Sequence, residues 1–231
     1  MNLRIAAAVV AVLAAATPVF AQRPVQPSPS PSPSPTTGVQ FRPFAVLTVE
    51  RFTASTTFDA TLDSAFQVLW GGGLQVTTRK NWFVDVSVTR MSRNGQRAFV
   101  DESGQEFRLA VPLHTTLTPV ELSVGRRFPL RRRATRRRRV TVIPYVGAGI
   151  GAYRYTESSD FSVAGEDTDS THLGYLVLGG AEFRVSKWVG IMGDAQYTRV
   201  PGIFGKGGVS QQAGESDLGG IAGRVRVILG R

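Results

Sequence analysis

The sequence of 231 residues contains no cysteine and only two histidines. Without cysteine, the chain has no disulfide framework, no lipid-modified N-terminal cysteine and no thiolate nucleophile or metal ligand. The apolar run near the N-terminus, residues 5–16, is only 12 residues long. A helix needs about 20 residues to cross the roughly 30 Å hydrocarbon core of a bilayer. We therefore expect this stretch to be a signal and not a membrane anchor.

The N-terminal segment has the three parts of a secretory signal peptide. Arg4 supplies the positive charge, the apolar run follows, and Val19 and Ala21 are the small residues that signal peptidase requires. Cleavage is expected before Gln22, so residues 1–21 are assigned to the signal peptide. Residues 22–38 alternate proline with serine and are expected to form an extended periplasmic linker. Residues 39–231 are assigned to one domain.

The formal net charge of +10 comes mostly from one short segment. Seven of its positive charges lie within nine positions: Arg131, Arg132, Arg133, Arg136, Arg137, Arg138 and Arg139. Nucleic acid is not the usual partner of an exported protein. The cluster is therefore interpreted as a periplasmic turn that contacts lipid headgroups, with no nucleic acid as partner.

From Gly38 onward the sequence shows no convincing helical pattern, and eight segments of alternating polarity appear instead. They cover residues 39–52, 65–78, 82–92, 117–128, 140–155, 172–185, 188–199 and 217–229. Each is longer than an ordinary soluble strand of about 5 to 6 residues and fits a tilted membrane strand of about 9 to 11 residues plus its ends. An even number of strands also allows an antiparallel sheet to close.

The connections between these segments alternate between short and long. Residues 79–81 and 186–187 form tight turns, whereas the other connections include stretches of 12, 24, 16 and 17 residues. In membrane barrels of bacteria the short turns face the periplasm and the long loops face outward. The loop 156–171 contains five acidic residues and is interpreted as a solvated acidic loop, with a weak cation site at Asp167 and Asp169 as the less favoured alternative.

One face of each segment is apolar, which fits either a membrane barrel or a soluble barrel of the lipocalin type turned inside out. Glycines concentrate on the opposite face, as a narrow lumen filled by long side chains would require: Gly71, Gly73, Gly147, Gly149 and Gly151. Trp82 and Trp188 follow tight turns and are predicted to be interfacial aromatics. The sequence also lacks a lipocalin Gly-X-Trp motif near its first strand, so the membrane barrel is favoured.

Three glycine-rich stretches resemble known small barrels. Residues 144–151, residues 178–186 leading into Trp188, and residues 219–227 are similar to the OmpA-like and OmpX-like members of the outer-membrane β-barrel domain family. The resemblance covers roughly residues 38–231. It implies an all-β fold, an eight-stranded antiparallel up-and-down transmembrane β-barrel in the bacterial outer membrane. Outer-membrane lipids and the outer-membrane assembly machinery are the partners that it implies.

Ten charged residues are expected to point into the lumen, and five are acidic and five basic. They are Arg42, Glu50, Asp85, Glu121, Arg127, Glu182, Arg184, Asp194, Arg224 and Arg226. Buried charges persist when they are paired, so this balanced set predicts a structural plug. His114 and His172 are interpreted as loop residues, and no catalytic residue, cofactor or metal ligand is assigned.

The sequence thus favours a non-enzymatic, monomeric outer-membrane barrel with long extracellular loops and a structural or surface-interaction role that involves an unknown surface partner. Three alternatives stay open: an outer-membrane enzyme on the same barrel, similar to lipid A deacylases or omptin proteases; a narrow porin; and a soluble ligand-binding barrel.

Overall fold

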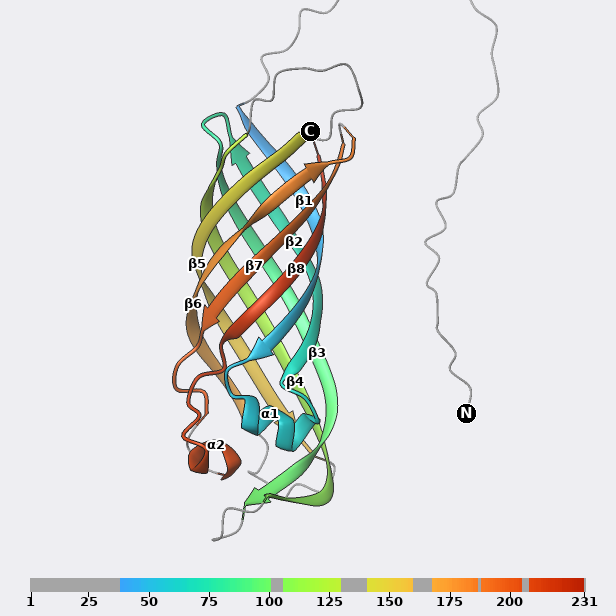
Figure 1. Cartoon of the computed structure of the whole chain (residues 1–231), viewed down its shortest axis with the longest axis vertical. Helices are drawn as coiled ribbons and strands as arrows, with labels where there is room; N and C mark the ends of the chain where they lie inside the picture. The colour runs from blue at the N-terminus through green and yellow to red at the C-terminus, as the bar shows by residue number, and fades with distance from the viewer. Residues whose placement is uncertain are drawn as a thin grey trace, which may run out of the picture. The chain divides into compact units, whose positions relative to one another are not determined.

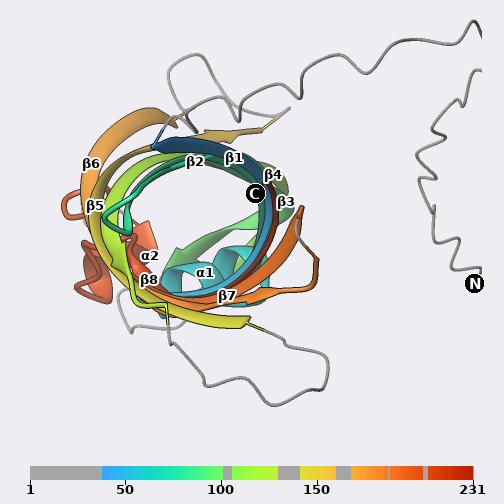
Figure 2. The ribbon, with the colours of Figure 1, turned by 90° about the horizontal axis from the view of Figure 1, so that it is seen from above.

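Eight antiparallel strands close into a barrel in the order of the chain (Figure 1). The structure is a computed structural model and describes residues 38–100, 106–129, 141–159, 168–186, 188–204 and 208–230. The strands are β1 (Val39–Phe52), β2 (Phe66–Thr78), β3 (Trp82–Val100), β4 (Glu106–Arg127), β5 (Thr141–Ser158), β6 (Thr168–Arg184), β7 (Val189–Arg199) and β8 (Gly220–Leu229). The predicted up-and-down barrel is confirmed, and Figure 2 shows its ring of strands from above.

The first strand closes the ring because it pairs with both the second and the last. Leu47 of β1 lies opposite Trp70 of β2 on one side and Val225 of β8 on the other. Along β1 the side chains are alternately exposed and buried, so each strand presents one face to the lumen and one to the outside. A closed ring leaves no unpaired strand edge around its circumference.

The outer surface is apolar and the lumen holds the charges. Trp70, Ile150 and Ile221 are each more than 60% exposed, whereas Arg42 and Arg226 are at most 2% exposed. A soluble barrel has the reverse distribution, with its apolar face turned inward. This surface suits a hydrocarbon environment and supports the membrane barrel over the soluble alternative.

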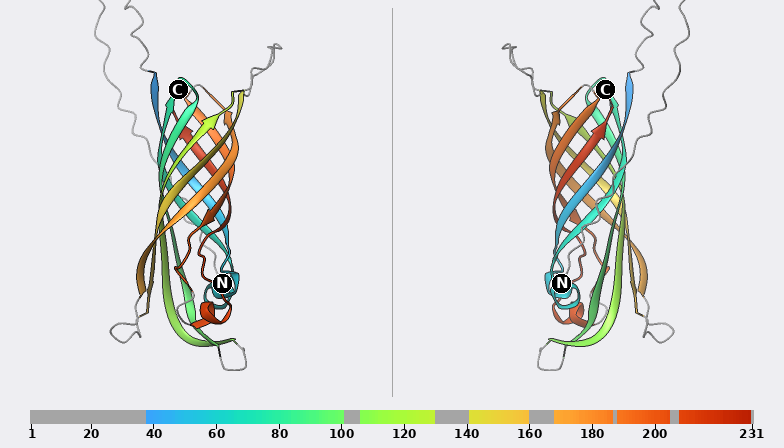
Figure 3. Two further views of the ribbon diagram at one scale, coloured as in Figure 1. Left: turned by 90° about the vertical axis from the view of Figure 1, so that its left-hand side faces the viewer. Right: turned by 90° about the vertical axis from the view of Figure 1, so that its right-hand side faces the viewer.

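Two hairpins are longer than predicted. The segment 93–116, expected to be a loop of 24 residues, is mostly strand, and the register continues through Asn94 opposite His114. Likewise β5 and β6 remain paired as far as Glu157 opposite Thr168. The apolar alternation ends where the outer surface becomes polar, but backbone pairing continues beyond it. Both hairpins extend past the end of the ring, as the side views in Figure 3 show.

Two helices interrupt the strand pattern, contrary to the expectation of no helix. Helix α1 (Ser55–Leu62) follows β1, and α2 (Gly208–Gln212) precedes β8. With 8 residues, α1 makes only about two turns, too few for a 3.6-residue period to stand out in the sequence. Seen from above, α1 lies within the outline of the ring (Figure 2). We call this end of the barrel the helix end, and the opposite end, where β2 connects to β3 and β6 connects to β7, the turn end.

Several predicted features lie outside the described residues. They include the signal peptide, most of the linker and the arginine cluster from Arg131 to Arg139. Within the described part of the chain, no helix is long and apolar enough to cross a membrane.

Candidate functional site

The ten charged residues expected on the inner face all project into the lumen. Nine are buried, and Arg184 is half-buried. They divide into a group centred on Glu182, near the turn end, and a group centred on Asp194, in the middle of the barrel. Each group draws its members from strands far apart in sequence, so the interior is cross-linked through side chains.

Three arginines surround the carboxylate of Glu182, which is completely buried. Arg42 donates from both terminal nitrogens, at 2.6 Å to Oε1 and 3.0 Å to Oε2, and also contacts Gln75 at 2.9 Å. Arg184 donates from Nε at 3.1 Å, and Arg127 forms a short bond to Oε2. A bidentate arginine pair is among the stronger ionic hydrogen bonds. This Glu182 cluster therefore joins β1, β4 and β6 across the lumen.

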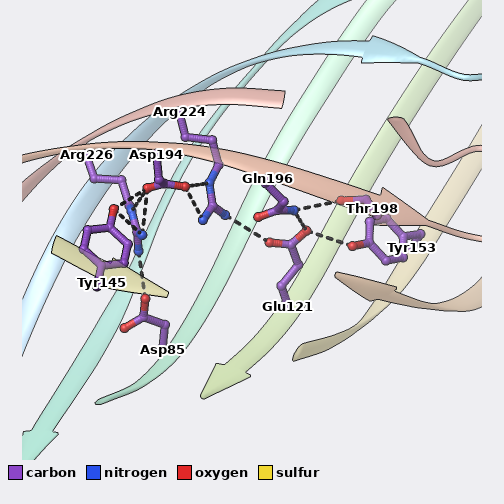
Figure 4. Close-up of polar contacts among 9 residues, drawn as sticks. All are labelled: Asp85, Glu121, Tyr145, Tyr153, Asp194, Gln196, Thr198, Arg224 and Arg226. Atoms are coloured by element: carbon purple, nitrogen blue, oxygen red, sulfur yellow. Dashed lines mark hydrogen bonds and ion pairs between the residues drawn. The ribbon is translucent and has the colours of Figure 1, made fainter. Parts of the chain in front are cut away.

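Asp194 accepts hydrogen bonds from two arginines and a tyrosine (Figure 4). Arg224 donates from Nε at 2.6 Å, Arg226 donates from Nε at 3.0 Å and Nη2 at 2.8 Å, and the Tyr145 hydroxyl donates at 2.7 Å. Arg226 also donates from Nη1 to Asp85 at 2.8 Å. Its guanidinium lies 5.3 Å from the centre of the Phe44 ring, within the range of a cation–π contact. The Asp194 cluster thus ties β8 to β3, β5 and β7.

Glu121 extends the Asp194 cluster toward the helix end. Its Oε1 accepts from the Tyr153 hydroxyl at 2.8 Å and from Gln196 Nε2 at 2.9 Å, and its Oε2 lies 3.5 Å from Arg224 Nη1 (Figure 4). A cavity of about 20 Å³ adjoins these residues and is also lined by Glu50 and Thr48. A single water needs roughly 10–15 Å³ of such space, so this part of the lumen has room for very little solvent.

The helix end is closed by apolar side chains, which we call the apolar plug. The Phe58 ring of α1 stacks on Phe52, with centroids 4.4 Å apart, and meets the Phe204 ring edge-on at 6.0 Å. The other members of the plug are Ala54, Leu62, Ala65, Leu69, Met91, Leu117, Tyr153, Tyr155, Val200, Leu218 and Ile203. Sequence reasoning missed this plug, although Phe58 and Leu62 within the predicted first loop were a signal that could have indicated it.

Helix α1 is anchored by Glu215, a residue of the segment between α2 and β8. The Glu215 carboxylate accepts from the backbone amides of Thr56 and Thr57, both at 2.9 Å, and from the Thr57 hydroxyl at 2.7 Å. It takes the place of an N-cap side chain, because the methyl side chain of Ala54 at the N-cap has no hydrogen-bond acceptor. Partial burial raises the pKa of Glu215, but the bonds from Thr57 and Thr56 outweigh it, and the pKa is lower than usual.

Glycines on the inner face make room for large rings. A Cβ on Gly125 would lie 2.4 Å from the Phe83 ring, and one on Gly151 would lie 2.8 Å from the Tyr153 ring. Both distances are below ordinary van der Waals contact. The concentration of glycines on this face therefore has a steric cause, as the sequence suggested.

The remaining predicted residues are distributed over the strands. His114 and His172 belong to β4 and β6, so their assignment to loops is wrong. Asp169 forms an exposed ion pair with Arg154 at 2.6 Å, and the described residues contain no group of three or more side chains placed to hold a metal. Asp167 lies outside the described residues.

Both predicted interfacial tryptophans lie at the turn end with exposed rings. Trp82 begins β3, and the guanidinium of Arg126 lies 5.9 Å from the centre of its ring. Trp188 directly precedes β7. Exposed tryptophans with a cation beside them are typical of the boundary between hydrocarbon and water.

Several solved structures are similar to this chain. No curated protein matches the sequence. Neisserial surface protein A is 14% identical, over 84% of this chain and 96% of that one, with a TM-score of 0.46. The N-terminal β-barrel domain of OprF from Pseudomonas aeruginosa is 12% identical, over 82% of this chain and 97% of that one, with a TM-score of 0.41. The attachment invasion locus protein of Yersinia pestis is 11% identical, over 83% of this chain and 95% of that one, with a TM-score of 0.44.

A family model supplies the assignment. The model described as the outer membrane protein beta-barrel domain matches residues 6–218, which is most of the chain. The apolar outer surface and the closed eight-stranded ring fit this description. The chain therefore belongs to the outer membrane protein beta-barrel domain family and is a protein of the bacterial outer membrane.

Proposed function

We propose that this protein is a sealed barrel whose role is structural or depends on contacts made at its helix end, and that the lumen neither conducts nor catalyses. One observation carries the proposal. The lumen is filled at three successive levels, by the Glu182 cluster, by the Asp194 cluster and by the apolar plug. Outer-membrane lipids are the proposed partners of its apolar surface, and the ring closes within one chain, which supports a monomer.

The charge pairs support sealing over ion conduction. Glu182 and Asp194 are each held by more than one arginine, and removing a charge from such a buried group leaves its partners unpaired. A conducting pore instead keeps charged side chains in contact with water. Opening a path through this lumen would therefore require several ion pairs to break together.

The helix end is the proposed site of surface contacts. The extended β3–β4 and β5–β6 hairpins project there beyond the ring, and α1 is held there by Glu215 (Figure 3). These elements give the barrel a broad polar end on the side of the longer connections, which faces outward in barrels of this kind. The hairpins replace the long loops that the sequence predicted as the surface-presenting part of the chain.

Conductance in planar lipid bilayers tests the proposal. The wild-type protein is expected to show at most small, infrequent openings. Phe58→Ser should change this little, because the two charge clusters still fill the lumen. Adding the charge-balanced pair Asp194→Ser and Arg226→Ser should increase the openings. Large, stable steps from the wild type would show a narrow porin instead and would contradict the sealed lumen.

A further inference from the structure

Three polar side chains on the outside of the barrel form a connected chain of hydrogen bonds. Ser92 Oγ lies 3.2 Å from His114 Nε2, and His114 Nδ1 lies 2.7 Å from Asn94 Oδ1. All three side chains are exposed. They lie on the β3–β4 hairpin, toward the helix end, and take no part in the lumenal clusters.

The register of the two strands brings these residues together. Asn94 lies directly opposite His114, and Ser92 lies opposite Thr116, two residues away on each strand. Residues two apart on a strand share a face, so Ser92 and Asn94 flank the imidazole from one strand. The arrangement therefore follows from paired backbones and not from a loop conformation.

The hydrogen bonds determine the tautomer of His114. An amide oxygen only accepts, so Nδ1 must carry the proton that is shared with Asn94. In the neutral imidazole Nε2 is then unprotonated and can accept the proton of the Ser92 hydroxyl. A hydroxyl beside a basic nitrogen, with the ring oriented by a third group, is the arrangement of an activated serine nucleophile.

The surroundings indicate what such a centre would meet. On the same outer face, the apolar residues Val84, Val86 and Val88 of β3 are all more than 40% exposed and end four positions before Ser92. The exposed Arg90 lies between the apolar stretch and Ser92. On the neighbouring strands Thr118 lies opposite Arg154, whose guanidinium is already paired with Asp169, so Arg90 is the cation assigned to the headgroup. An amphiphile fits this arrangement, because its apolar chains would contact the valines and its anionic headgroup would contact Arg90.

We propose that Ser92, His114 and Asn94 form a hydrolytic centre for carboxylic esters of anionic amphiphiles at the membrane surface. This goes beyond the sealed barrel proposed above, which assigns no chemistry to the outer face. Ser92 and His114 act as nucleophile and base, and Asn94 is a positioning residue that holds the imidazole. Arg90 binds the anionic headgroup.

The reaction needs only water as a second reactant. Ser92 Oγ attacks the ester carbonyl carbon while its proton passes to His114 Nε2, and the tetrahedral intermediate expels the alcohol, which takes that proton. Water then gives a proton to Nε2 and attacks the acyl-serine. Collapse of the second intermediate returns the proton to Ser92 Oγ and releases the carboxylic acid, so the centre is regenerated.

A fluorophosphonate probe and p-nitrophenyl esters test the proposal on the full-length protein in bilayers. The wild type is expected to form an adduct at Ser92 and to hydrolyse a long-chain p-nitrophenyl ester. Ser92→Ala should lose both, and His114→Gln should lower kcat/KM by about 100-fold or more. Arg90→Gln should raise KM for phosphatidylglycerol in vesicles more than it raises KM for the neutral p-nitrophenyl ester.

Matched variants separate chemistry from structure. Ser216→Ala, at an exposed serine elsewhere, should keep the adduct and the hydrolysis rate. Asn94→Leu should reduce hydrolysis and Asn94→Asp should restore it, which a purely structural role would not produce. Heat-modifiable gel mobility checks that each variant is folded. If the folded wild type hydrolyses the ester no faster than Ser92→Ala, or if the probe labels both equally, the centre does not exist.

Discussion

Thr57 and Glu215 are 158 residues apart in sequence, yet the Glu215 carboxylate accepts hydrogen bonds from both the amide and the hydroxyl of Thr57. This contact ties the connection between β1 and β2 to the one between β7 and β8 at the helix end. It also supplies the N-terminus of α1 with the negative charge that a helix dipole favours.

Acid should release α1. The folded-state pKa of Glu215 is lower than its usual value of 4.5, so its stabilising contribution is present above that value and is lost as the pH falls through the folded pKa. The contribution is expected to be about 0.5–1 kcal/mol, at the lower end for helix caps because the group is only partly buried. The NMR shifts of the Thr56 and Thr57 amides, followed as the pH is lowered from about 7, measure the loss of their hydrogen bonds to Glu215. Glu215→Gln should show weakened α1 at neutral pH, while Asp169→Asn should not.

Removing Asp194 should destabilise the barrel strongly. Asp194→Ala leaves Arg224, Arg226 and the Tyr145 hydroxyl without a shared acceptor, and breaking a buried pair in this way costs about 3–5 kcal/mol. Adding Arg226→Leu should cost less than the sum of the two single changes, because the contacting residues are coupled. Denaturant unfolding in lipid vesicles gives all three values. Additive losses would mean that the two side chains do not share an interaction.

Gly151 and Gly223 should respond oppositely to a larger side chain. Gly151→Val would push against the Tyr153 ring and its bond to Glu121, at a cost of about 1–3 kcal/mol. Gly223 faces outward on β8 with nothing within 4 Å of a built Cβ, so Gly223→Val should be close to neutral. Unfolding of both variants in vesicles measures the difference, and Tyr153→Ala should recover part of the loss in Gly151→Val. Equal effects at the two glycines would contradict the steric role of Gly151.

The helix end should face the outside of the cell. Protease added to intact cells is then expected to cut within 101–105 or 160–167, the connections at the tips of the two extended hairpins. The arginine cluster from Arg131 to Arg139 connects β4 to β5 at the opposite end and should be cut only after the cells are permeabilised. Cleavage of the cluster in intact cells would reverse the orientation.

Alternation of polarity predicted the parts of the strands that cross the membrane, because every second side chain must face the lipid and the others must face the lumen. Along β1, for example, Leu47 and Val49 face outward while Thr48 and Glu50 face the lumen. The same signal ends where the outer surface becomes polar, so it missed the outer halves of β3 and β4, which are held by backbone pairing. Helix α1 was missed for a different reason, since its N-terminus is capped from a distant part of the chain.

The sequence predicted which charged residues face the lumen, but it could not predict which of them form ion pairs. Inward orientation follows from local alternation, whereas the contact between Arg42 and Glu182 spans 140 residues and depends on the stagger of six strands. The Ser92, Asn94 and His114 group shows the same limit. The sequence indicates the residue types, but the register between β3 and β4 determines that they meet.

The Arg42–Glu182 contact also constrains the order of events during assembly. Arg42 lies on the first strand and Glu182 on the sixth, so a growing sheet that has not closed leaves both charges without each other. Glu182 can still pair with Arg184 of its own strand and with Arg127 of β4, but Arg42 would have no carboxylate partner near the hydrocarbon, which is costly. Insertion is therefore expected to be cooperative, because the pairing of β1 with β8 closes the barrel and brings Arg42 to Glu182 in the same step. Its rate should be slow, because the contacts that reward closure are the most distant in sequence.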